Sequence, residues 1–182
     1  MRIFILLTMM ILGAVGFAFA DKKNELPWRK NHYLVWADFQ GSVDKTSDHH
    51  ASTHSGVRYS YKWSLKNDEL IMRFDVESLF DRSKSWVNKK KRTKTLLAHE
   101  QLHFDITEIH ARLLRKAFKD ATWNNDNFKE QVKEISNENK KTRLKMQDDY
   151  DEETAHSQNK DEQAKWAKKI KRLLEETDSL RD

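Results

Sequence analysis

Two stretches in the first half of the chain alternate between apolar and polar residues. Every second residue is apolar over residues 57–65 and again over residues 70–76. A period of two predicts strands that bury one face. Asn67 and Asp68, which lie between the two stretches, are residues typical of turns. The pattern therefore predicts an antiparallel hairpin.

From Thr93 onward the apolar positions follow the period of a helix, which predicts a first helix that ends near Asp120. A second helix is predicted from Asn125 or Asn127 through Met146, with a break over residues 150–158. A last helix is predicted from Asn159, because Glu162 follows three residues later as in a capping box. The sequence thus predicts an α+β fold, with a small antiparallel sheet in the N-terminal half and a zincin-like helical half after it.

The first twenty residues have the composition of a secretory signal peptide. Arg2 precedes an apolar run over residues 3–17, and Ala18-Phe19-Ala20 fits the small-x-small pattern of a cleavage site. The run is shorter than the roughly 20 residues of a membrane-spanning helix. We therefore expect residues 1–20 to be removed and residues 21–182 to form one secreted or periplasmic domain, without stable membrane insertion. An uncleaved anchor is the alternative.

Composition narrows the class of protein further. The 182 residues include no Cys, so disulfides do not stabilise the fold even in an oxidising compartment. The net charge of +5 is spread over a mixed surface, apart from the run over residues 89–92. That run has no interleaved aromatic residues for base stacking, so we expect no binding to nucleic acid.

Residues 99–103 read His-Glu-Gln-Leu-His, the H-E-x-x-H pattern, inside the first predicted helix. Residues four apart lie on the same side of a helix, so His99 and His103 can offer two nitrogens to one Zn²⁺ ion. Glu100 lies about 100° around the helix and can reach a water without being a ligand. The pattern predicts zinc hydrolysis, with Glu100 as the general base.

Catalytic zinc normally has three protein ligands, so one must come from outside this pattern. Glu108 points away from His99, and His110 lies too far along the helix axis. His156, in the predicted break, is our candidate for the third ligand, with Asp151 and Glu153 as acidic alternatives. Tyr150 is either a hydrogen-bond donor to the oxyanion or a packing residue. Weaker candidates are Asp105 as a partner of an imidazole, and His49, His50 and His54 as a loop that binds metal.

The chain also resembles a family of bacterial exported proteins, known as a domain of unknown function or as secreted zinc-dependent proteases. The resemblance runs from about Trp28 to Leu174 and is most specific at the H-E-Q-x-H-F-D-I core. The other matching segments are Trp36 to Gly41, Ser55 to Tyr59, and a late motif of Tyr150, Asp151, Thr154, His156, Gln163 and Trp166. This late motif implies that His156 and Tyr150 belong to the site. Ser157 departs from the pattern, since we expect Gly there in relatives, and this alters a turn rather than a ligand.

We therefore expect an exported zinc-dependent metallopeptidase that acts on a peptide or protein substrate. One alternative is an exported zinc-binding or structural protein that catalyses no reaction. Such a protein would have no use for the carboxylate of Glu100, so Glu100 distinguishes the two readings. Another is a zinc amidase that acts on cell-wall peptides. Nothing in the sequence distinguishes cell-wall peptides from protein substrates.

Overall fold

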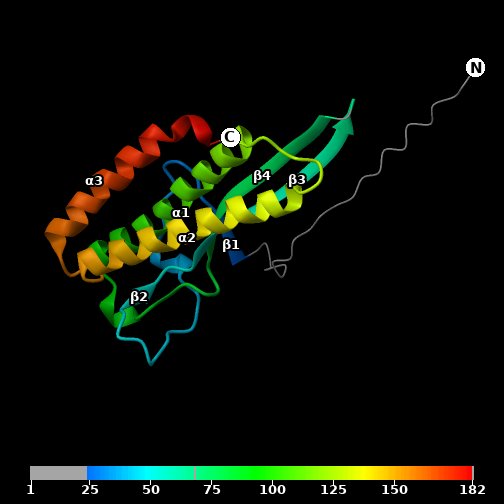
Figure 1. Ribbon diagram of the computed structural model, residues 1–182. Helices are drawn as coiled ribbons and strands as arrows, with labels where there is room; N and C mark the ends of the chain where they lie inside the picture. The colour runs from blue at the N-terminus through cyan, green and yellow to red at the C-terminus, as the bar shows by residue number, and fades with distance from the viewer. Residues whose placement is uncertain (1–23, 68, 182) are drawn as a thin grey trace, which may run out of the picture.

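The computed structural model describes residues 24–67 and 69–181, and the expected signal peptide lies outside these ranges. The strands come first and three long helices follow, so the predicted α+β class is confirmed. Figure 1 shows the hairpin of β3 and β4 extending along one side of the helices. Within the described ranges, no helix is both long enough and apolar enough to cross a membrane.

The predicted hairpin consists of β3 (Ser55–Lys66) and β4 (Glu69–Asp81), paired antiparallel from Ser55 opposite Phe80 to Lys66 opposite Glu69. Asn67 has a left-handed backbone with φ of 51°, as the turn requires. The short strand β1 (Glu25–Pro27) pairs with the end of β4, which gives the order β1-β4-β3. A second, two-stranded sheet joins β2 (Ala51–Ser52) to β5 (Trp86–Val87). Both sheets are antiparallel; the sequence predicted the hairpin of the first sheet but not the second sheet.

Helix α1 (Lys94–Asp120) carries the H-E-x-x-H pattern and is the central element of the fold. The hydroxyl of Thr93 caps it by accepting a hydrogen bond from the Leu96 amide. The sheets lie on one side of α1, and α2 (Phe128–Thr154) and α3 (Lys160–Glu176) pack on its other faces. Asn159 caps α3 by accepting from the Glu162 amide, so the predicted start of the last helix is confirmed.

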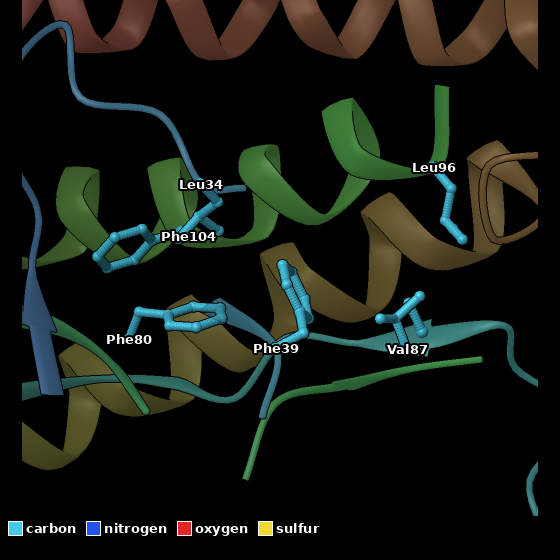
Figure 2. Close-up of a cluster of buried hydrophobic side chains, with 7 residues drawn as sticks. Leu34, Phe39, Phe80, Val87, Leu96 and Phe104 are labelled. Atoms are coloured by element: carbon cyan, nitrogen blue, oxygen red, sulfur yellow. The ribbon is translucent and has the colours of Figure 1, made fainter. Parts of the chain in front are cut away.

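Three apolar clusters fix α1 in place. Figure 2 shows the first, which joins the N-terminal loop and the strand ends to the first half of α1. A second joins the far half of α1 to the hairpin and α2, and a third joins α1 to α2 and α3. Their central residues are Phe39, Phe80 and Phe104, then Val76, Leu114 and Phe118, then Ile106, Tyr150 and Trp166. The helix that carries the H-E-x-x-H residues is therefore packed on several sides.

The predicted break over residues 150–158 is wrong at its start, because α2 continues to Thr154. Ala155, His156 and Ser157 then follow with left-handed backbones. The sequence pattern weakens here because polar residues of α2, not apolar ones, face α1. Asp151 consequently lies on a helix rather than in a loop.

The segment from Trp36 to Gly41 has a structural role. Asp38 accepts hydrogen bonds from the Val35 amide and from Arg82, and Phe39 packs in the first cluster. A Cβ atom at Gly41 would lie 2.9 Å from the carbonyl oxygens of Ser83 and Ser85. Only glycine therefore fits this close approach.

Candidate metal centre

Three side chains from two helices converge on one point. His99 and His103 lie on α1, and their Nε2 atoms are 3.2 Å apart. Asp151, on the last turn of α2, places Oδ1 3.1 Å from Nε2 of His99 and 3.0 Å from Nε2 of His103. Among the residues that the structure describes, these three form the group whose ligand atoms could hold a metal ion.

The geometry of this group fits a small tetrahedral ion. Zinc–nitrogen and zinc–oxygen bonds of about 2.0–2.1 Å imply ligand atoms roughly 3.3 Å apart at the corners of a tetrahedron. The three observed separations between ligand atoms, 3.0, 3.1 and 3.2 Å, are close to that value. Two imidazoles with one carboxylate are also a donor set typical of catalytic zinc.

Each imidazole is oriented by a glutamine on its far edge. Nδ1 of His99 lies 3.0 Å from Oε1 of Gln163 on α3, and Nδ1 of His103 lies 2.5 Å from Oε1 of Gln147 on α2. An amide oxygen can only accept, so both Nδ1 atoms carry a proton, and the Nε2 atoms are the nitrogens that can bind a metal once they have lost theirs. Such partners fix the tautomer that a metal ligand requires.

Glu100 is buried beside these ligands, with 3% of its surface exposed. Its Oε2 atom has no hydrogen-bond partner among the described residues. A buried carboxylate oxygen without a partner is costly for folding, which indicates that something absent from the protein itself satisfies it. A water molecule at the centre would be such a partner.

The carboxylate of Asp151 and the imidazole of His103 shift each other's pKa. Burial alone raises the pKa of Asp151, but hydrogen bonds from His103 and His99 outweigh it and hold the pKa far below its usual range. Burial lowers the pKa of His103, but the hydrogen bond to Asp151 and its negative charge together raise it. The pair therefore favours an ionised carboxylate, the form that binds metal.

Tyr150 is fully buried, and its ring contacts the rings of His99 and His103. Its ring stacks on His99, and its hydroxyl lies 3.3 Å from the His99 carbonyl oxygen and 3.0 Å from Oε1 of Gln163. Burial raises the pKa of this phenol, so it stays protonated. These contacts lie on the Nδ1 side of His99 and support a positioning role; a role as oxyanion donor stays a prediction.

His156 lies beside the cluster rather than within it. Its Nδ1 atom is 3.4 Å from Oδ1 of Asp151, and its ring packs against the ring of His49. Asp151, one of the acidic alternatives, lies where we expected His156, because α2 continues to Thr154, about two turns beyond Met146. Glu153 instead accepts a hydrogen bond from Trp166 Nε1. A ligand role for His156 thus stays a prediction.

The other polar residues considered from the sequence have separate roles. Glu108 binds Ser78 and Arg112 on the side of the sheet, and Asp105 binds Trp28 and Gln101. His110 is buried, as expected of a core histidine, and burial lowers its pKa to about 4. None of these three side chains contacts the imidazoles of the centre.

Sequence reasoning missed the role of Gln147. It lies four residues before Asp151, so both face α1, and that spacing is the signal that could have found it. Gln163 appeared only as part of the late motif, without a role, although it holds both His99 and Tyr150. Both glutamines depend on contacts between helices that periodicity does not reveal.

One of three comparisons with known proteins found a match. A family model described as "Bacterial protein of unknown function (DUF922)" matches residues 36–157, which is more than half of the chain. The match begins at Trp36 and ends just after His156, so it includes the two motif histidines, Glu100 and Asp151. The comparison with curated proteins and that with solved structures gave no match. The chain belongs to this bacterial family of unknown function.

Proposed function

We propose that this protein is an exported zinc-dependent metallopeptidase. The observation that carries the proposal is the placement of Glu100 beside the convergent atoms of His99, His103 and Asp151, with a buried Oε2 that has no hydrogen-bond partner among the described residues. A purely structural zinc site has four protein ligands and no need for an adjacent carboxylate.

His99, His103 and Asp151 hold the zinc ion, with His156 close enough to join or replace a ligand. When bound, zinc supplies the Lewis acidity that makes water nucleophilic at neutral pH and polarises the substrate carbonyl. Glu100 accepts the proton of the attacking water and passes it to the leaving amine. Gln147 and Gln163 keep the imidazoles in place, and the Tyr150 ring stacks on the ring of His99.

The test is metal analysis combined with a broad peptide-cleavage screen of the wild-type protein and of Glu100→Gln. We expect one zinc per chain in both proteins, and hydrolysis lower by roughly 10²- to 10⁴-fold in the variant. Glu134→Gln, an exposed carboxylate change on α2, is the control and should keep full activity. Zinc binding without any cleavage would favour a non-catalytic zinc protein instead. Cleavage confined to cell-wall peptides would identify an amidase.

Export is a separate part of the proposal. It is supported by Arg2, the apolar run after it and the small residues at 18–20. N-terminal sequencing of the protein made by its own host should begin at Asp21. A protein that still starts at Met1 and sediments with membranes would contradict export by cleavage.

A further inference from the structure

The edge of β4 that faces away from β3 is paired over only part of its length. β1 pairs with β4 from Leu79 to Asp81, whereas β3 pairs with it as far as Glu69. Figure 1 shows the hairpin extending well past β1. Within the described part of the chain, most of this edge of β4 therefore has no neighbouring strand.

Two hydrogen bonds show which backbone groups face the open edge. The carbonyl of Ser78 accepts from the Trp28 amide, and the carbonyl of Val76 accepts from the guanidinium of Arg115. Alternate residues of a strand direct their backbone groups to the same edge. Three further residues therefore present theirs there, namely Leu70, Met72 and Phe74. On that side, no hydrogen bond from the described residues reaches these three. Unpaired groups along an edge are a template for another strand.

A groove with a volume of about 980 Å³ follows this edge of β4. Its other walls are the C-terminal half of α1, the loop after β1 and the end of the chain around Leu180. Met72, Phe74 and Trp123 line the groove and are only partly buried. A groove of this size and apolar character is large enough for an extended segment of several residues.

The groove is basic towards both of its ends. Arg29 lies at one end, next to Trp28, and Lys119 lies towards the hairpin turn, next to Phe118. Both cations are exposed, and neither forms an ion pair with a described residue. An exposed cation at each end of an apolar groove favours a ligand that has carboxylates around an apolar centre.

The acidic residues of the groove do not cancel this charge. Glu77 and Glu108 are paired with Arg58 and Arg115. Glu69 and Asp75 lie at odd-numbered positions of β4, so their side chains point to the face of the sheet opposite that of Phe74. The side of the groove that faces α1 is therefore the basic side.

We propose that this groove binds an extended segment of a partner protein, which adds a strand to the open edge of β4 and carries apolar side chains between carboxylates. The backbone of the segment supplies the hydrogen bonds that residues 70–74 lack on this side. Its apolar side chains cover Met72, Phe74 and Trp123, and its carboxylates pair with Arg29 and Lys119. A second copy of this chain fits less well, because it would bring an equally basic groove against the first.

The groove is separate from the metal centre. Glu108, which lines it, lies about 180° around α1 from His99. Arg115, on the wall of the groove, lies about 18 Å along the helix axis from His103. Binding of the partner segment therefore does not depend on the proposed peptidase function.

The test uses the mature Glu100→Gln protein with zinc supplied, so that the probe is not hydrolysed. The probe is a capped peptide, Glu-Thr-Val-Thr-Val-Thr-Glu, which in extended form has two Val between two Glu on one face. We expect hydrogen exchange to slow by about tenfold or more at four amides of β4, those of Leu70, Met72, Phe74 and Val76. The amides between them, which already pair with β3, should change little.

Two methylated peptides separate strand addition from side-chain binding. One carries N-methyl groups at its odd positions and the other at its even positions. Only one of these two sets of N–H groups faces β4 in an added strand, so only one peptide should lose affinity, by about tenfold or more. Equal affinities of the two methylated peptides would overturn strand addition.

A charge exchange tests the kind of partner. The peptide with Lys in place of both Glu should bind about tenfold or more weakly. Charge reversal in Arg29→Glu/Lys119→Glu should invert this preference, whereas Lys140→Glu, an exposed change on α2, should preserve it. Equal affinities for the Glu and Lys peptides in the parent protein would overturn the proposal.

Two further outcomes would also overturn it. The first is unchanged exchange at the four β4 amides with the probe at up to about 1 mM. The second is protection of these amides without peptide, together with a concentration-dependent dimer in sedimentation equilibrium, which would identify a second copy of the chain as the occupant. Cleavage of peptides by the wild-type protein, or its absence, affects none of these results.

Discussion

The carboxylate of Asp151 lies 3.0 Å from Nε2 of His103, although 48 residues separate them in the sequence. This contact joins the last turn of α2 to the motif turn of α1. A metal ion held there would close the long chain segment between them and stabilise the packing of the two helices.

The first prediction concerns the third ligand. Asp151→Asn should weaken zinc binding by more than the roughly 10- to 100-fold that loss of an outer partner costs, because it removes a ligand charge. Asp148→Asn, an exposed change on the same helix, should keep the zinc. Metal content after dialysis and melting temperature with and without chelator measure this.

His156→Ala belongs in the same experiment. If this variant keeps its zinc while Asp151→Asn loses it, Asp151 is the third ligand. The reverse result would assign that role to His156, as we expected from the sequence, and would leave Asp151 as its neighbour at 3.4 Å.

The second prediction concerns Gln147, which fixes His103 from its far edge. Gln147→Ala should weaken zinc affinity by about 10- to 100-fold, because the imidazole loses its fixed tautomer and orientation. Gln131→Ala is the control on the same helix, since the Gln131 side chain bonds to the Asn124 amide and to the Thr122 carbonyl rather than to a histidine. Competition with a fluorescent chelator gives both affinities. Equal affinities in the two variants would show that Gln147 does not orient the ligand.

The third prediction is a pH dependence of stability. His110 is buried and its pKa is lowered to about 4, so in the folded protein it stays neutral between pH 6.5 and 4. The unfolded chain takes up the proton below its ordinary pKa of about 6.5, so the free energy of unfolding falls as pH decreases through this window. The loss amounts to about 3 kcal/mol.

His110→Gln, which cannot titrate, should lack this loss. Urea unfolding of both metal-free proteins at pH 7 and pH 4 measures it, and all other titrating groups are shared. If the free energy of unfolding falls equally in both proteins between pH 7 and pH 4, His110 is not held neutral in the folded state.

The fourth prediction concerns the turn after α2, where Ser157 has a left-handed backbone with φ of 74°. Ser157→Gly should raise the free energy of unfolding by about 1 kcal/mol, because glycine adopts this conformation without the clash of a Cβ atom. The melting temperature should rise by about 2–4 °C. Ser157→Ala keeps the Cβ atom and should not raise the free energy of unfolding. An equal increase in both variants would show that the backbone of Ser157 is not strained.

The sequence by itself determined the hairpin, the first helix and the start of the last one. These elements depend on local periodicity, turn residues and capping residues, which act over a few positions. It also determined the pairing of His99 with His103 and the place of Glu100, because one helix turn fixes their spacing.

Only the tertiary structure decided which residue joins the two histidines. Asp151, Gln147 and Gln163 reach them through the packing of α2 and α3 on α1. The end of α2 was not visible in the sequence, because its inward face carries polar residues that bind the centre instead of an apolar stripe.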